Sequence, residues 1–308
     1  MRRRSKAPSS PLPQRDGIDP VRVRLPEDPE GVWGTVREHL LDRYAGAIGA
    51  GRVEDMLLSG RFVGTDGPVG GDEPYAVGRY LWFHRDFPDE TPVPFPIGVV
   101  HRDERIVVAD KPHFLATMPR GRHVTETATA RLRRELGLPS LQPAHRLDRL
   151  TAGLVLFVVR AEDRGAYQTL FRDRLVRKEY EAVAPYDPAV ALPATVRSRI
   201  EKERGVMAAR EVPGEPNSES RIELVGHSGG RGRYRLVPVT GRTHQLRVHM
   251  NALGLPLLHD PVYPVVREDG PEDFSRPLQL LARTLEFSDP LTGRAMRFES
   301  RLALSSLA

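Results

Sequence analysis

AHRLDRLTAGLVLFVVR, residues 144–160, joins a charged segment to an apolar one. Four of its first six residues are polar: His145, Arg146, Asp148 and Arg149. A Thr-Ala-Gly turn follows, and the apolar run over 154–159 has the length and β-branched content of a buried strand. A single carboxylate among cations at the mouth of a strand is a candidate reactive group. The alternative is a polar loop whose ion pairs are purely structural.

The bulk composition is typical of a globular protein, with 308 residues, 39% hydrophobic and 28% charged. This length predicts two domains. No apolar run approaches the roughly 18 residues that a membrane span needs, and the N-terminus lacks the apolar core of a signal peptide. The absence of cysteine excludes disulfides and thiolate catalysis. We therefore expect a cytoplasmic protein without a membrane segment, and a monomer, because no long heptad pattern is exposed.

The net charge of +5 is unevenly distributed along the chain. Residues 1–14 carry four basic and no acidic side chains, whereas residues 15–100 carry nine basic and fifteen acidic ones. Residues 101–180 are again basic, with sixteen basic against ten acidic side chains. A polyanion is therefore expected to bind around the middle of the chain.

Composition also predicts the domain organisation. Residues 1–14 are rich in Pro, Ser and Arg and predict a disordered basic tail. A small domain is expected over residues 15–90, with amphipathic helices within 32–59 and short strands within 61–82. The Pro-rich residues 91–98 are expected to form a linker, and residues 99–308 a second domain.

The second domain is expected to begin with a strand ending at Asp110. Thr125 is expected to cap a helix that runs to Leu136, with Arg131, Arg133 and Arg134 on its exposed side. Further expected elements are a helix over 162–174, strands over 178–183 and 233–240, a helix from Thr243 with a core stripe of Leu246, Met250 and Leu253, and two closing strands within 278–287 and 293–300. Residues 200–233 show no steady period and predict an irregular connection or a long exposed hairpin.

Several kinds of chemistry lack their motifs in this sequence. Neither a G-x-x-x-x-G-K-[ST] loop nor a convincing G-x-G-x-x-G loop is present. His244 and His249 are five residues apart, about 140° around a helix, which does not suit two ligands of one metal. No serine has the setting of a catalytic nucleophile. We therefore expect neither a metal nor a cofactor.

Asp148 remains as the candidate reactive group. It must be ionised to act as a nucleophile or base, so it needs a fixed cation nearby, and Arg247 on a helix is the best candidate. Arg247 could equally be a surface arginine. Tyr180 could stack on a flat substrate or be a core tyrosine. Arg146 and Arg149 could hold phosphates or be solvated charges.

These residues carry a resemblance to a known family. HRLDRLTAGLVLF resembles the signature H-R-L-D-x-x-T-S-G-L of the RluA family of pseudouridine synthases. ADKPHFLATMP, RKEYEAV and VTGRTHQLRVHM are similar to three further blocks of that family, in the same order, and the resemblance covers roughly residues 97–300. The segment RVEDMLLSGRFVGTDGPVGGDE has a faint likeness to the S4 RNA-binding module, so the small domain could be a degenerate S4-like domain.

The resemblance implies a role for each matching residue. Asp148 would be the catalytic aspartate, Tyr180 would stack on the target uracil, Arg247 would be the salt-bridge partner of the aspartate, and Arg146 would enter the RNA helix near the flipped nucleotide. Further residues of the matching blocks are expected to contact RNA: Lys111, His145, Arg149, Lys178, Arg242 and His244.

The resemblance also implies the fold and the reaction. The fold would be α+β, a pseudouridine synthase fold with a mixed, largely antiparallel central sheet flanked by helices. The enzyme would isomerise uridine in rRNA or tRNA without a cofactor or metal, after flipping the base out of its stack. Two rivals remain: a non-catalytic RNA-binding or ribosome-assembly factor of the same fold, and a glycosidase-like hydrolase, which would need a second placed carboxylate.

Overall fold

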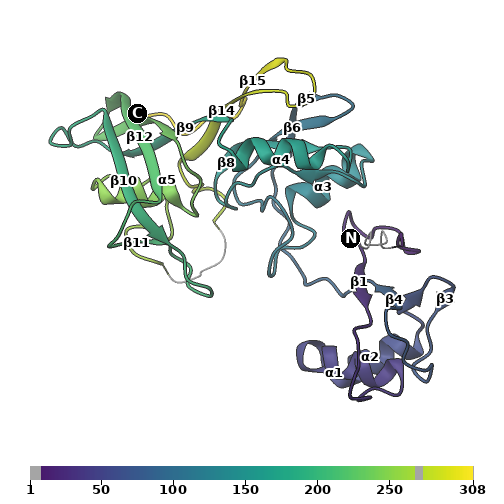
Figure 1. The fold of residues 1–308 in the computed structure, drawn as a ribbon. Coiled ribbons are helices and arrows are strands. Elements are labelled where there is room, and N and C mark those ends of the chain that lie inside the picture. Colours follow the sequence, from purple (N-terminus) through teal and green to yellow (C-terminus); the bar gives the residue numbers. More distant parts are fainter. Residues whose placement is uncertain (1–7, 268–272, 308) are drawn as a thin grey trace. The chain divides into compact units, whose positions relative to one another are not determined.

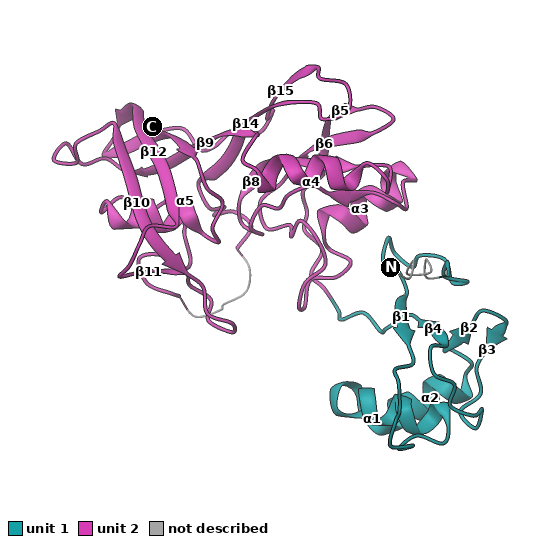
Figure 2. Cartoon of the chain, viewed as in Figure 1, with its two compact units in different colours: residues 1–89 teal, residues 90–308 magenta. Residues whose placement is uncertain are grey.

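The computed structural model describes residues 8–267 and 273–307. The chain forms two compact units, Met1–Asp89 and Glu90–Ala308 (Figure 2). Half of the expected basic tail, residues 1–7, lies outside the described residues. Within the described residues, no helix combines the length and apolar character needed to cross a bilayer.

The first unit packs two helices against a small antiparallel sheet with strand order β1-β4-β2-β3 (Figure 1). Its elements are β1 (Val21–Arg24), α1 (Val36–Ile48), α2 (Ala50–Leu58), β2 (Val63–Gly64), β3 (Gly67–Pro68) and β4 (Tyr80–Phe83). Thr35 and Glu38 form a reciprocal capping box that starts α1. The two helices and the strands β2 to β4 lie at or next to their predicted positions, whereas β1 was not predicted. Leu40, Val53 and Leu81 are fully buried between these elements.

The second unit is built on one large sheet with strand order β11-β10-β12-β13-β9-β14-β8-β6-β5, to which β7 and β15 add at β8 and β14. Its strands are β5 (Gly98–Arg102), β6 (Ile106–Lys111), β7 (Gln142–Pro143), β8 (Ala152–Val158), β9 (Arg177–Pro185), β10 (Ala194–Glu201), β11 (Arg210–Val212), β12 (Ser218–Ser228), β13 (Arg231–Pro238), β14 (Leu280–Ser288) and β15 (Ala295–Glu299). Its helices are α3 (Ala128–Leu136), α4 (Arg164–Arg172) and α5 (Gln245–Ala252). Among the described strands, β8 and β14 form the one parallel pair. The expected α+β class with a mixed, largely antiparallel sheet is therefore confirmed.

The apolar run of the opening stretch forms β8, whose seven residues are all buried. Gly153 stands where this strand first meets β14. A Cβ atom there would lie 2.3 Å from the Ala282 carbonyl oxygen, and its φ of +111° is one that other residues rarely adopt. Glycine therefore lets β8 approach β14 closely, which brings the charged residues before it alongside the strands of the central sheet.

The start of α3 differs from the expectation. Thr127, not Thr125, caps the helix by accepting a hydrogen bond from the Ala130 N–H. The Thr125 N–H and hydroxyl instead donate to the carboxylate of Glu90. Arg133, expected on the exposed side, is buried and donates to the Leu141 carbonyl at 2.9 Å, because it faces the segment that follows the helix.

Residues 91–98 do not form a free linker but are packed onto the second unit. Arg131 donates hydrogen bonds to the carbonyls of Val93 and Phe95, at 2.7 and 2.9 Å. Val93 is buried and Phe95 packs against the core. The many prolines of this segment therefore favour an extended chain that lies along the unit's surface.

Of the two expectations for residues 200–233, the long hairpin is found in the second half, where the eleven-residue strand β12 pairs antiparallel with β13. Its inward positions Ser218, Ser220 and Ile222 are all buried. Two of these three are serines, so the apolar alternation that marks a half-buried strand is hidden.

Candidate active site

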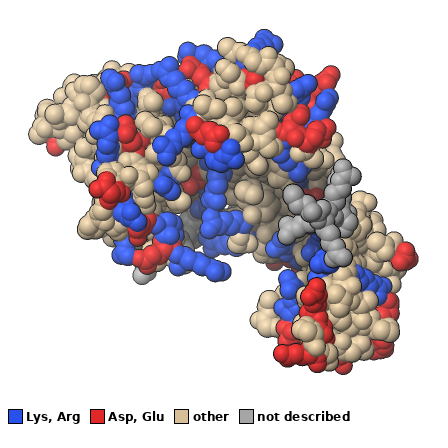
Figure 3. Space-filling view, in the orientation of Figure 1, with Lys and Arg blue, Asp and Glu red and all other residues tan. Residues whose placement is uncertain are grey.

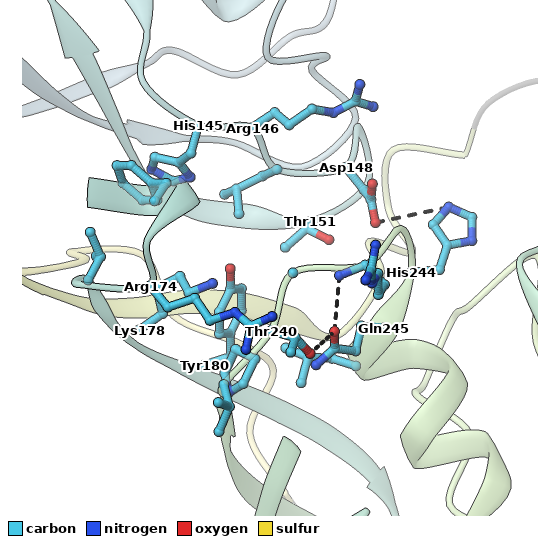
Figure 4. A pocket seen from close by; sticks show the side chains of 18 of the residues that line it. His145, Arg146, Asp148, Thr151, Arg174, Lys178, Tyr180, Thr240, His244 and Gln245 are labelled. Carbon is cyan, nitrogen blue, oxygen red and sulfur yellow. Dashed lines mark hydrogen bonds and ion pairs between the residues drawn. The ribbon is translucent and has the colours of Figure 1, made fainter. Parts of the chain in front are cut away.

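A cavity of about 490 Å³ opens in the second unit (Figure 4). Its walls come from the loop between β7 and β8, the end of α4, the start of β9, the loop after β13 and the first turn of α5. Six of its lining residues are cationic: Arg146, Arg172, Arg174, Lys178, Arg242 and Arg247. Asp148 is the one carboxylate among the described lining residues, so the cavity is a cationic site around a single acid.

The backbone on either side of Asp148 is fixed. The Thr117 hydroxyl donates to the Leu147 carbonyl and accepts from the Leu147 N–H, at 2.9 and 3.1 Å. The Thr151 N–H closes a turn onto the carbonyl of Asp148 at 3.1 Å. The side chain of Asp148 stays 26% exposed, so the carboxylate can meet a ligand in the cavity.

His244 lies beside this carboxylate, with its Nε2 atom 4.0 Å from Oδ2 of Asp148 (Figure 4). Its other ring nitrogen, Nδ1, is 3.0 Å from the Tyr263 hydroxyl. Burial, and then the charge of Arg247, lowers the pKa of His244 to about 4 against the pull of Asp148. The imidazole is therefore neutral near pH 7. Its side chain is 13% exposed, and its expected contact with RNA stays a prediction.

Arg247 lines the cavity, but its ion pair is not the expected one. Its Nε and Nη2 atoms donate to both oxygens of Asp260, at 2.8 and 2.6 Å, and both side chains are buried. Oδ1 of Asp260 also accepts the N–H groups of Val262 and Tyr263. Arg247 therefore acts on Asp148 through its charge and not, in this structure, through a salt bridge.

Tyr180 lies on β9 and is both a cavity residue and a core residue. Its ring lines the cavity and is half-buried against two core clusters. Burial, and then the charge of Asp148, raises the pKa of its hydroxyl far above the ordinary value. The phenol therefore stays protonated, and the ring offers an aromatic wall close to the carboxylate.

Three of the other predicted cations line the cavity. Arg146 and Arg242 are exposed, Lys178 is half-buried, and all three line the cavity. Burial, and then the charge of Arg174, lowers the pKa of Lys178. These side chains form a basic wall, and Lys and Arg also gather over the hollowed middle of this unit in Figure 3.

The prediction that Lys111 contacts RNA is wrong, because this residue is buried and has a structural role. It is fully buried, and its ammonium group donates to the carbonyls of Pro112, Leu115 and Arg149, at 2.9, 2.8 and 3.2 Å. Burial lowers its pKa to about 7, against the opposing charge of Asp148. Because it holds the carbonyl next to Asp148, Lys111 fixes the loop that carries Asp148, and its burial leaves it no surface for RNA.

His145 and Arg149 make contacts within the protein, and their expected RNA contacts stay predictions. The His145 ring stacks on Phe171 at 4.2 Å, and its Nε2 atom accepts the Leu156 N–H. Burial, and then Lys178, lowers its pKa to about 3, so this ring is a neutral part of the cavity wall. Arg149 does not line the cavity and donates to the Phe114 carbonyl.

The sequence prediction missed several residues of the site. Gln245 accepts hydrogen bonds from the Thr240 hydroxyl and the Arg242 N–H, at 2.7 and 3.0 Å, and so shapes the loop after β13. Arg172 and Arg174 extend the basic wall. The signal for these arginines was the density of basic residues in FRDRLVRK, which has no spacing that marks a site.

The arrangement can hold a polyanion and place one of its flat groups against Tyr180 and Asp148. One carboxylate within a cationic, partly enclosed site can act as a nucleophile or a base on a neutral ring system. Among the described side chains, no group of three His, Asp or Glu residues is arranged as metal ligands.

Comparisons with known proteins place this geometry in a family. Residues 105–252 match the family model described as RNA pseudouridylate synthase. The chain is 34% identical over 178 residues to human pseudouridylate synthase RPUSD2, covering 54% of this chain and 31% of that protein. It is 31% identical over 212 residues to the dual-specificity RNA pseudouridine synthase RluA of Pasteurella multocida, covering 66% and 92%.

A solved structure supports the fold. Human RNA Pseudouridylate Synthase Domain Containing 1 superposes with a TM-score of 0.55 at 22% identity, over 71% of this chain and 94% of that one. The matched region spans about a third of the length of the human relative RPUSD2 but nearly all of the bacterial relative. With its ordered sequence blocks and this match, the chain belongs to the RluA family of pseudouridine synthases.

Proposed function

We propose that this protein is an RNA pseudouridine synthase. In this reaction the N1–C1′ bond of a uridine breaks, the uracil turns within the pocket, and C5 bonds to C1′ of the same ribose. No atom is gained or lost overall, so no water has to be activated and no second carboxylate is required. A flipped uracil would lie against Tyr180, with its ribose at Asp148.

One observation carries the proposal: Asp148 is the lone carboxylate lining a cationic cavity among the described residues. The basic wall suits the phosphates on either side of a flipped nucleotide. Contacts with phosphates and stacking on an aromatic ring offset the few kcal/mol that unstacking a base costs.

The competing functions fit this geometry less well. A glycosidase usually needs two carboxyl groups across the bond, and the cavity offers one. A pure RNA-binding protein of the same fold gains nothing from a carboxylate next to phosphates, because the charges repel.

The substrate is proposed to be a structured RNA of the rRNA or tRNA class. The Pasteurella relative is named a dual-specificity enzyme, and a yeast mitochondrial relative is named for tRNA pseudouridine 32. The cytoplasmic location and the monomeric state stay predictions.

Tritium release from RNA labelled at uridine C5 tests the activity directly. The purified full chain should release tritium from total rRNA or tRNA of the source organism, because the C5 hydrogen leaves during isomerisation. Binding of both RNAs without release would support the rival binding factor. Mapping pseudouridines by carbodiimide modification, with and without the gene, would then identify the target.

A further inference from the structure

The reaction proposed above needs a base for the hydrogen at C5, in a step that follows the cleavage of the glycosidic bond. After C5 has bonded to C1′, that carbon still carries its hydrogen, and the ring has a C6–N1 double bond. Loss of the C5 proton returns its electron pair to the C5–C6 bond, and the C6–N1 pair moves to N1, which takes up a proton. Breaking the glycosidic bond and removing this proton are successive steps at different atoms.

His244 has an unusual backbone for its position. It precedes α5 in the left-handed conformation, with φ of 58°, and its side chain makes no capping hydrogen bond. N-cap positions usually have extended backbone and a short polar side chain. A strained, non-capping histidine is the kind of feature that accompanies function, because the surrounding structure must offset its cost.

The hydrogen-bond network assigns the tautomer of this ring. The Tyr263 hydroxyl donates to the Ala209 carbonyl at 2.8 Å and accepts the Ala209 N–H at 2.9 Å. Its single hydrogen is thereby used, so Nδ1 of His244 must donate to it at 3.0 Å. The opposite assignment would deprive the buried Ala209 carbonyl of this donor.

With the hydrogen on Nδ1, the Nε2 atom is a bare acceptor in the cavity wall. Its 4.0 Å separation from Oδ2 of Asp148 is longer than a hydrogen bond, as expected for two acceptors that face a common space. A substrate group held against Asp148 therefore lies within reach of Nε2. The nearby Tyr180 hydroxyl is protonated and Arg247 is a cation, so neither can serve as the base.

We propose that Nε2 of His244 accepts the C5 proton, and that Tyr263 and the Ala209 backbone fix the tautomer that allows it. This inference rests on the proposed synthase activity and adds the base of its last step. The imidazolium then returns the proton to solvent, so the reaction remains a net isomerisation without an oxidant or a cofactor.

The test uses substitutions that suit the backbone. His244→Gly is compatible with a positive φ and leaves a space that free imidazole can enter. Tritium release should fall by about 10²-fold or more, the usual contribution of a positioned base. Imidazole added to the buffer should restore at least a tenth of the lost rate, and His244→Asn, which also tolerates this backbone, should show the same loss.

His259→Gly is the matched control. His259 has nearly the same φ, 59°, and its Nδ1 atom donates to the Pro277 carbonyl at 3.2 Å. It does not line the cavity. Its variant should release tritium at the wild-type rate. RNA affinity and melting temperature, measured for all variants, separate a loss of chemistry from a loss of binding or folding.

Two results would overturn the assignment. One is a rate for His244→Gly or His244→Asn within threefold of wild type. The other is a slow His244→Gly enzyme that binds RNA normally and gains nothing from imidazole. Failure of the proposed activity itself would look different, because the wild-type protein would then release no tritium.

Discussion

Asp260 grips Arg247 with both of its carboxylate oxygens, and neither side chain is more than 2% exposed. The hydrogen bonds and charge of Asp260 outweigh burial and raise the pKa of the guanidinium. Nη1 makes no hydrogen bond within the described part of the chain, so one end of the fork stays available. The cation is thus oriented before any ligand enters the cavity.

Asp260→Asn should destabilise the second unit strongly. Removal of the negative charge leaves a buried guanidinium without compensation, which typically costs about 3–5 kcal/mol. Urea unfolding followed by circular dichroism measures the change. Arg297→Gln is the control, because that arginine is 67% exposed in its pair with Glu286 and should matter by less than about 1 kcal/mol. Equal stability of the two variants would contradict the structural role of Asp260.

Asp148→Asn should remove catalysis and keep binding. The amide has the shape of the carboxylate but cannot ionise, so tritium release should fall by at least about 10²-fold. RNA affinity should stay equal or rise, because a negative charge has left a cationic cavity. Asp187→Asn, in the loop after β9 and away from this cavity, is the control and should retain full activity. Retention of activity by Asp148→Asn would refute its assignment.

Arg146→Gln should weaken RNA binding in a salt-dependent way. Arg146 is exposed at the cavity and has no hydrogen bond or ion pair to other described residues. Loss of one phosphate contact should reduce the slope of log affinity against log salt concentration by about 0.7–0.9. Filter binding at several salt concentrations measures this slope. Arg294→Gln, on the exposed turn between β14 and β15, should leave it unchanged.

Local sequence was enough to predict the elements that frame the site. The run over 154–159 indicates a strand because its period and residue types are local properties. The end of α3 at Gly137 is equally local, since glycine readily adopts the observed φ of 64°. Asp148 stood out because it was the lone acid of a basic segment, and Tyr180 because it is an aromatic residue on a predicted strand next to a basic region.

Burial and long-range pairing could not be read in the same way. Lys111 looks like an RNA contact because its charge is visible in the sequence, whereas the three carbonyls that bind it come from folded loops. Arg247 pairs with Asp260, thirteen residues later in the chain, because the intervening segment turns back, and no local sequence pattern predicts this pairing. Ser218 and Ser220 conceal a buried strand in the sequence because they are polar. Their hydroxyl groups form hydrogen bonds with side chains of α5, where a typical buried strand would make apolar contacts.

The first unit should lose stability in mild acid through His39. Its ring is buried against Trp33 and Tyr75, and neither ring nitrogen has a hydrogen-bond partner among the described residues. Burial, and then the charge of Arg43, lowers its pKa below the ordinary value of about 6.5.

The sign of this effect follows from proton binding. Below about pH 6.5 the His39 side chain binds a proton in the unfolded chain but not in the folded unit. The stability of the unit is therefore unaffected by His39 above that pH and falls as the pH drops toward the pKa of His39 in the folded unit. The slope approaches about 1.4 kcal/mol per pH unit for one proton. Both tryptophans of the chain, Trp33 and Trp82, lie in this unit, so tryptophan fluorescence during urea unfolding at pH 7.5 to 5 reports on it alone.

His39→Phe should flatten this pH dependence, because phenylalanine keeps the aromatic packing and cannot titrate. Some slope should remain, since burial and Arg15 also lower the pKa of His84 in the same unit. The matched variant His84→Phe should therefore remove a separate share of the slope and leave that of His39. An unchanged slope in His39→Phe would show that folding does not lower the pKa of His39, which would contradict this prediction.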